Sequence, residues 1–166
     1  MHLDIFGEMI AKADVSIVIP TVVRDSIYSA LASVFAQKNI GRIHVLIGVD
    51  VAEGNLEQLR EFSLRAPKNI SISILSLPYS TSVRHGGVHM AMDGGSLRAI
   101  LSLMANSNYV AYLDDDNTWA ENHLSKLVDK IQGKAWAFSH RFLIDEDTGE
   151  NYGQDLWHSV GVDKGD

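Results

Sequence analysis

The sequence predicts an α/β protein with a mainly parallel central sheet and helices on both of its faces. Short β-branched runs alternate along the chain with segments whose apolar residues recur at helical spacing. The 166 residues are 46% hydrophobic and 21% charged, which is ordinary for one soluble globular domain. We therefore expect a single domain that spans 1–166.

The first strand and helix are predicted near the amino terminus. Val15 to Ile19 is a short β-branched run closed by Pro20, which predicts a buried strand. The apolar positions within 25–37 recur at helical spacing, and Asp25 or Ser26 is available as the N-cap. This order of strand and helix begins the α/β pattern.

Two more strands, a helix and a long loop follow. The run 43–49 predicts a second strand, and the side chain of Asn55 is placed to cap the next helix. The run 70–77 alternates polar and apolar residues at first, so we expect a strand nearer an edge, with one wetter face. The segment 79–95 has two glycine pairs and no periodicity, which predicts a loop that is either functional or merely mobile.

The second half of the chain repeats the alternation. Ser96 is placed to cap a helix with an apolar stripe, and the run that begins at Tyr109 predicts a central strand ending in three aspartates. Helical spacing returns in 121–131, and 135–144 predicts a last strand. The letters D-E-D-T-G-E after it are typical of a hairpin turn.

Charge and composition exclude several classes of function. The formal net charge of -7 argues against unaided binding to nucleic acid or to an anionic membrane, and an anionic ligand would need a cation as mediator. The absence of cysteine excludes disulfides and thiolate metal sites and fits a cytosolic chain. We expect neither a signal peptide nor a transmembrane segment, because no basic leader and no apolar run of spanning length occurs. The expected location is cytoplasmic, with peripheral membrane association left open.

Polar residues stand where three of the predicted strands end: Thr21, Asp50 and the triplet Asp114 to Asp116. Because the carboxyl ends of parallel strands meet at one edge of a sheet, we expect these residues to share a crevice. No G-x-G-x-x-G follows the first strand, and no G-x-x-x-x-G-K-[ST] occurs. A dinucleotide-binding Rossmann site and a P-loop are therefore disfavoured.

The three adjacent aspartates predict a divalent cation, because neighbouring carboxylates repel one another at a strand end. In an extended segment Asp114 and Asp116 point to one side and Asp115 to the other. Mg²⁺ or Mn²⁺ commonly binds through one or two carboxylates plus substrate phosphates. The alternatives are an ordinary acidic loop here and a helix or turn cap for Asp50.

Four motifs in order resemble the donor-nucleotide half of the family-two glycosyltransferases, nucleotide-diphospho-sugar transferases with the Rossmann-like GT-A fold. They are V-S-I-V-I-P-T, S-V-F-A-Q, V-L-I-G-V-D and Y-V-A-Y-L-D-D-D-N-T-W-A-E-N-H-L, and they fall within 15–144. The resemblance implies a metal-dependent, inverting hexosyltransferase-like enzyme that uses a nucleotide-diphospho-sugar donor, expected to be a UDP-sugar. The resemblance does not identify the acceptor, which is a saccharide, a lipid or a protein. It also leaves the oligomeric state open, a homo-oligomer included. A nucleotidyltransferase is disfavoured because the usual glycine- and lysine-rich loop after the first strand is absent.

The resemblance also implies site residues, with the triplet as the family's D-x-D motif. It assigns nucleotide binding to Thr21, Asp50, Arg98, Asp114 and Asp115, and metal binding to Asp116 and Asp114. Thr21 and Asp50 would hold the base, Asp115 would face the ribose, and Arg84 is the rival of Arg98. Asp50 suits a base with an N–H donor such as uracil, because a carboxylate only accepts hydrogen bonds.

The general base of an inverting member is not identifiable, so the catalytic residue is unknown. The acidic residues after the last predicted strand lie in a hairpin turn or in a tail without periodicity: Asp145, Glu146, Asp147, Asp155 and Asp163. His158 matches a histidine that some proteins of this fold add to the metal, with an ordinary surface histidine as the alternative. The acceptor-binding part is therefore short or missing, and a catalytically silent nucleotide-sugar-binding or assembly module is the alternative function.

Overall fold

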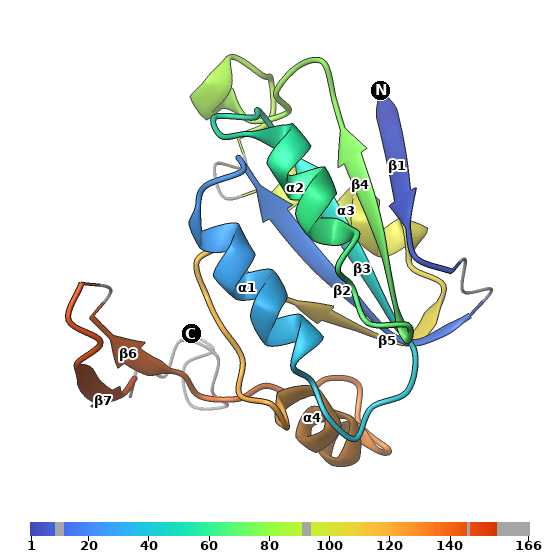
Figure 1. Ribbon diagram of the computed structural model, residues 1–166, viewed down its shortest axis with the longest axis vertical. Coiled ribbons are helices and arrows are strands. Elements are labelled where there is room, and N and C mark those ends of the chain that lie inside the picture. Colours follow the sequence, from blue (N-terminus) through green and yellow to red (C-terminus); the bar gives the residue numbers. More distant parts are fainter. Residues whose placement is uncertain (9–11, 91–93, 146, 156–166) are drawn as a thin grey trace. The chain divides into compact units, whose positions relative to one another are not determined.

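A five-stranded sheet forms the first of two compact units, residues 1–126, in the computed structural model (Figure 1). The structure describes residues 1–8, 12–90, 94–145 and 147–155. The strands are β1 (His2–Phe6), β2 (Ala13–Thr21), β3 (Ile43–Val49), β4 (Ile70–Ser76) and β5 (Ser107–Tyr112), in the spatial order β1-β4-β3-β2-β5. All of them are parallel except β1, which pairs antiparallel with β4. The predicted α/β class with a mainly parallel sheet is confirmed.

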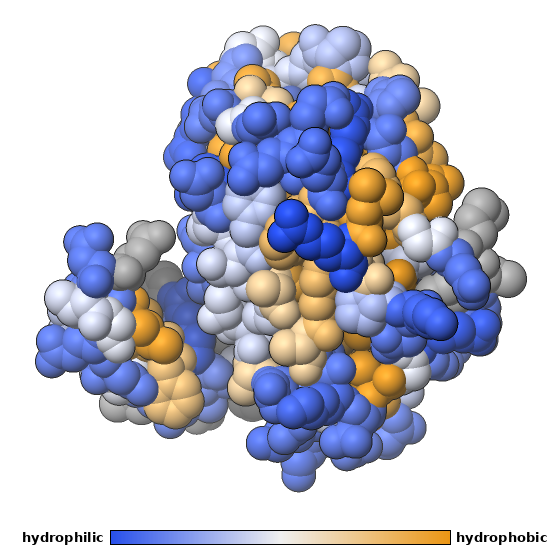
Figure 2. All heavy atoms as spheres, viewed as in Figure 1, coloured by the Kyte–Doolittle hydropathy of each residue, from blue (hydrophilic) through white to orange (hydrophobic). Residues whose placement is uncertain are grey.

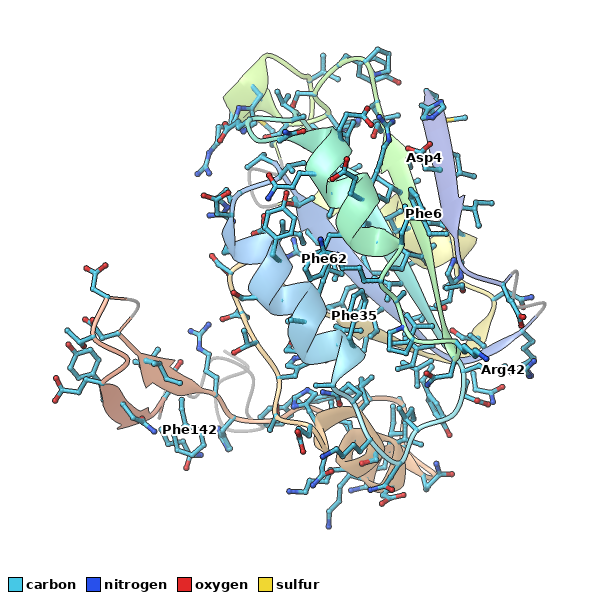
Figure 3. The ribbon with its side chains drawn as sticks, in the orientation of Figure 1. Asp4, Phe6, Phe35, Arg42, Phe62 and Phe142 are labelled. Atoms are coloured by element: carbon cyan, nitrogen blue, oxygen red, sulfur yellow. The ribbon has the colours of Figure 1, made fainter. Side chains whose placement is uncertain are left out.

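Helices cover both faces of this sheet. Figure 1 shows α1 (Ser26–Phe35) and α2 (Leu56–Ser63) in front of it and α3 (Gly95–Met104) behind it. The rings of Phe35 and Phe62 point toward one another between α1 and α2, and stack with centroids 5.6 Å apart (Figure 3). Hydrophilic residues gather over α2 on the outside of the same face (Figure 2). The amphipathic pattern of α2 thus matches its position between core and solvent.

The packing of α3 depends on a glycine in the sheet. Leu97 and Leu101 of α3 are fully buried, and a Cβ added to Gly48 of β3 would lie 2.9 Å from the side chain of Leu101. Leu101 also packs against Val18 and Leu46. Burying such a leucine contributes roughly 1.5–3 kcal/mol, so this close approach fixes α3 on the sheet.

One burial pattern and one strand position differ from the expectation. β4 lies next to the last strand on its side of the described sheet, β1, which pairs along it from His2 opposite Ser76 to Phe6 opposite Ile72. It is therefore near an edge as expected, but both of its faces are buried and neither is wetter. β5 is not central: in the described part of the chain it is the last strand of the sheet, and its side chains alternate between half-buried and exposed. The local pattern of each strand did not reveal its neighbours.

The helix starts confirm one of the three expected caps. Asn55 accepts a hydrogen bond from the backbone N–H of Gln58 at the start of α2, as predicted. Asp25 is the N-cap of α1, but its side chain makes no capping bond to a described residue. The expected cap Ser96 is wrong, because α3 begins at Gly95 and its N-cap lies two residues earlier than expected, at Gly94, which is left-handed with φ 75°. Glycine adopts this conformation without steric cost.

The second unit, residues 127–166, contains a hairpin of β6 (Phe142–Ile144) and β7 (Asn151–Gln154). The predicted hairpin turn is confirmed: the carboxylate of Asp145 accepts bonds from Thr148 and from the hydroxyl of Tyr152. The strand expected over 135–144 is much shorter and pairs with β7 instead of joining the large sheet.

The helix α4 (His123–Ile131) crosses from the first unit into the second. In the described ranges, no helix is both long and apolar enough to span a bilayer. The number of independently folding domains stays a prediction.

Candidate functional site

A cleft of about 450 Å³ lies at the carboxyl edge of the sheet in the first unit, within the usual range of ligand pockets, about 300–1,000 Å³. Loops after β2, β3, β4 and β5 and the start of α3 line it. The cleft brings together the residues with an expected nucleotide or metal role: Thr21, Asp50, Arg98, Asp114, Asp115 and Asp116, and also Arg84. Their roles stay predictions, while their common location follows from parallel strands that end at one edge.

Thr21 and Asp115 join the ends of two neighbouring strands, β2 and β5. The Thr21 hydroxyl donates a 2.6 Å hydrogen bond to Oδ2 of Asp115 and accepts a 2.8 Å bond from the N–H of Val23. Asp115 is only 2% exposed, whereas the side chains of Asp114 and Asp116 are 50% and 53% exposed. Asp115 and Asp116 lie in a turn in which the N–H of Asn117 donates to the carbonyl of Asp114 at 3.1 Å, so a turn and not an extended strand directs Asp115 inward.

Arg24, which the sequence reasoning did not select, is the cation that accompanies the buried Asp115. Its Nη2 bonds Oδ1 of Asp115, its Nε donates to Oδ2 at 3.5 Å, and Nη2 lies 3.7 Å from Asp116 Oδ2. The hydrogen bond to Asp115 raises the pKa of Arg24 above its usual value. A buried carboxylate without such a partner would be strongly destabilising. An arginine three residues after Thr21, in the loop that faces the triplet, was the available signal.

The backbone between Thr21 and Arg24 is strained. Val23 has φ 65°, in the left-handed region that β-branched residues rarely enter. The carbonyl oxygen of Val23 would lie 1.9 Å from a Cβ added to Gly54, and the N–H of Glu53 donates to the carbonyl of Val22 at 2.8 Å. The loops after β2 and β3 are thus locked to each other, which holds Thr21 and Arg24 in place.

Asp50 anchors the loop after β4. It is 8% exposed and accepts hydrogen bonds from the hydroxyl of Ser80 at 2.9 Å and from the N–H and hydroxyl of Thr81 at 2.9 and 3.3 Å. The turn-anchoring alternative therefore describes its contacts in this structure. A carboxylate can accept about four hydrogen bonds, so the expected bond from a base N–H remains available.

Arg98 lies in the first turn of α3 and forms an ion pair with Asp114. Gly94 allows this helix start to approach β2, because a Cβ there would lie 2.7 Å from Pro20. The start of α3 thus borders the cleft, where the positive end of the helix dipole favours an anion. Arg84, in the short 3-10 helix Val83–His85, adds a guanidinium group to the cleft lining.

The residues fit a divalent cation that binds together with phosphate. Among the described residues that line the cleft, five carboxylates face three guanidinium groups, a surplus of two negative charges that disfavours a lone diphosphate. Asp114 and Asp116 present half-exposed carboxylates, the oxygen ligands that Mg²⁺ and Mn²⁺ prefer. Within the described ranges, no three histidine or acidic side chains are grouped to hold a metal by themselves. Phosphate oxygens would have to complete the coordination.

The fold is shared with solved structures of S. aureus TarS, a glycosyltransferase of the GT-A type. The likeness to residues 1–349 has a TM-score of 0.58 at 16% identity, over 72% of this chain and 32% of that chain. The complex with UDP-GlcNAc has a TM-score of 0.57 at 18% identity, over 72% and 31%.

This chain has the GT-A fold. At such low identity the likeness shows the fold alone, and this chain spans about a third of TarS 1–349 and 21% of the longer TarS chain. TarS 1–349 has also been solved in complex with UDP. No protein-family model and no curated protein matches this sequence.

The acidic residues considered for the general base lie in the second unit or outside the described residues. Asp145 is held in the hairpin turn, where the backbone N–H of Thr148 lowers its pKa, and Asp155 pairs with Arg141 at 2.8 Å. Glu146, His158 and Asp163 fall outside the described residues. The catalytic residue therefore stays unassigned.

Proposed function

We propose that the protein binds a nucleotide-diphospho-sugar in the cleft together with Mn²⁺ or Mg²⁺ and transfers the sugar to an acceptor. The observation that carries this proposal is the gathering of Thr21, Asp50, Arg98 and the aspartate triplet around one cleft of a GT-A fold. The TarS complexes with UDP and UDP-GlcNAc support a uridine donor. A cytoplasmic location, inversion and the chemical class of the acceptor remain parts of the proposal.

The contacts in the cleft suggest how the donor would be held. Asp50 accepts the N–H of the base beside the loop it anchors, and the inward-facing Asp115 accepts a ribose hydroxyl through the lone pairs that Thr21 and Arg24 leave open. Arg98 and the start of α3 attract the diphosphate. Each role uses a group whose position is already fixed by neighbouring residues, so little ordering is needed on binding.

Transfer requires stabilisation of the departing nucleoside diphosphate. A bound divalent cation would act as a Lewis acid that offsets the charge developing on this leaving group. The guanidinium groups of Arg24 and Arg98 lie beside the exposed carboxylates of Asp116 and Asp114 and supply further hydrogen-bond donors to phosphate oxygens. The acceptor hydroxyl must lose its proton to a base that these groups do not provide.

Isothermal titration with UDP in the presence of Mn²⁺ tests this proposal. Wild-type protein should bind, and Asp116→Ala should bind at least about tenfold more weakly, because a carboxylate ligand of the cation is lost. Glu61→Ala, an exposed acidic residue of α2 away from the cleft, is the control for net charge. A wild type that does not bind, or Asp116→Ala with unchanged affinity, would refute the proposal.

A second candidate function is a nucleotide-sugar-binding or assembly module that transfers nothing. It is favoured by the lack of an assignable general base among the described residues, since Asp145 and Asp155 are engaged within the hairpin unit. Incubation with UDP-GlcNAc and Mn²⁺, followed by chromatography of released UDP, separates the two functions. Release of UDP above a protein-free control supports the enzyme, and binding without release supports the silent module.

A further inference from the structure

Arg24 places a positive charge between two carboxylates of the cleft. Its guanidinium bonds the buried Asp115 and lies 3.7 Å from the half-exposed Asp116. Its own side chain is 53% exposed, so it faces the cleft as well as the carboxylates. Any cation that binds Asp116 therefore approaches a carboxylate that already has a cationic neighbour.

The same charge acts in opposite directions on the two ligands of the proposed function. It repels a divalent cation that enters alone, and it partly neutralises the oxygens that would attract this cation. It attracts the oxygens of a diphosphate, to which a planar guanidinium can donate two parallel hydrogen bonds. If Arg24 had a purely structural role, its replacement would weaken the binding of the cation and of the diphosphate together.

We propose that Arg24 keeps the site from binding a divalent cation by itself and makes cation binding depend on the nucleoside diphosphate. This inference rests on the proposed function, because it concerns the same cleft and the same ligands. The diphosphate brings the negative charge that offsets Arg24, so the cation then meets phosphate oxygens in addition to Asp114 and Asp116. The loop geometry supports this role: strained Val23 and the approach of Gly54 fix the backbone next to Arg24.

The test compares Mn²⁺ binding and UDP binding in wild type and Arg24→Gln. Electron paramagnetic resonance of free Mn²⁺ measures the affinity for the ion alone, without nucleotide. Removal of the charge should strengthen the binding of Mn²⁺ alone by about tenfold and weaken that of UDP by a similar factor. Unchanged or weaker binding of Mn²⁺ by Arg24→Gln overturns the inference.

Two further variants separate charge from structure. Lys68→Gln removes an exposed positive charge outside the cleft lining, so Mn²⁺ alone should bind within about twofold of wild type. Arg24→Lys keeps the charge but lacks the forked donor, and should bind Mn²⁺ nearly as weakly as wild type. If Arg24→Lys instead binds Mn²⁺ as tightly as Arg24→Gln, displacement of Asp115 is the cause and the inference is wrong.

The two proposals fail separately. If wild-type protein does not bind UDP with Mn²⁺, the proposed function fails and the dependence of the cation on the nucleoside diphosphate fails with it, while the titration with Mn²⁺ alone still decides whether Arg24 repels the cation. If UDP binds but Arg24→Gln does not gain affinity for Mn²⁺, the proposed function stands and the inference about Arg24 falls. Circular dichroism and urea unfolding of each variant confirm that folded protein is compared.

Discussion

Thr21 donates a 2.6 Å hydrogen bond to Asp115, a residue 94 positions further along the chain. The bond is buried and connects the ends of the neighbouring strands β2 and β5. The same hydroxyl accepts the N–H of Val23, so one side chain fixes both a strained loop and a buried carboxylate. Loss of this hydroxyl should therefore affect stability as well as ligand binding.

Thr21→Val should destabilise the fold by about 1–3 kcal/mol, because it leaves the N–H of Val23 and an oxygen of Asp115 without their buried partner. Thr21→Ser keeps the hydroxyl and should lose much less stability than Thr21→Val. Urea unfolding of both variants and of the wild type measures the difference. Equal stability of Thr21→Val and wild type would show that this hydrogen bond contributes nothing.

Asp50→Ala should release the loop after β4, since three hydrogen bonds from Ser80 and Thr81 end on this carboxylate. We expect the backbone amide of Thr81 to exchange at least about tenfold faster, because a hydrogen bond to a charged group is worth roughly 1.5–3 kcal/mol. Hydrogen exchange measured by mass spectrometry tests this. Asp25→Asn, whose side chain makes no capping bond to a described residue, is the control. Unchanged protection of Thr81 in Asp50→Ala would contradict the anchoring role.

Gly54→Ala should be more damaging than Gly86→Ala. A Cβ at Gly54 would lie 1.9 Å from the backbone oxygen of Val23, so the two locked loops must separate. We expect a cost of about 1–3 kcal/mol or more for this overpacking. Gly86 has open space around its Cβ position, and only its φ of 87° opposes alanine, which costs roughly 1 kcal/mol. Thermal unfolding compares them, and an equal loss at both sites would refute the clash.

Acidification should destabilise the protein through His44 and His123, whose pKa values are lowered by burial. The unfolded chain takes up protons first as the pH falls below about 6.5. The stability that the two neutral histidines contribute is therefore fully present above this pH. It is lost below this pH, by at most about 1.4 kcal/mol per pH unit for each histidine.

Urea unfolding at pH 7.5 and 5.5 measures this loss. His44→Gln keeps a partner for the hydroxyl of Ser73, which lies 2.9 Å from the imidazole, and should show a smaller loss. His140→Gln, at an exposed position, is the control and should behave like wild type. A loss in His44→Gln as large as that of wild type would exclude His44 as a cause.

Strands and caps with a strong local signal could be predicted from the sequence. The run Ile43–Val49 is β-branched and apolar, and it forms β3 with these bounds. Asn55 caps α2 as its position suggested. The positions of Ser71 and Ser73 suggested a wetter face, yet both are buried, and the hydroxyl of Ser73 lies 2.9 Å from the imidazole of His44 on β3. Local alternation cannot distinguish a serine in water from a buried serine.

The aspartate triplet shows the same limit at the site. The sequence by itself determined that Thr21, Asp50 and Asp114 to Asp116 stand at strand ends, and parallel strands must bring such ends to one edge. Only the tertiary structure decided that Asp115 turns inward to Thr21 and Arg24, and that Asp50 holds Ser80 and Thr81. The reason is physical: these contacts join loops from different strands, so they depend on strand order and loop conformation, which local periodicity does not encode.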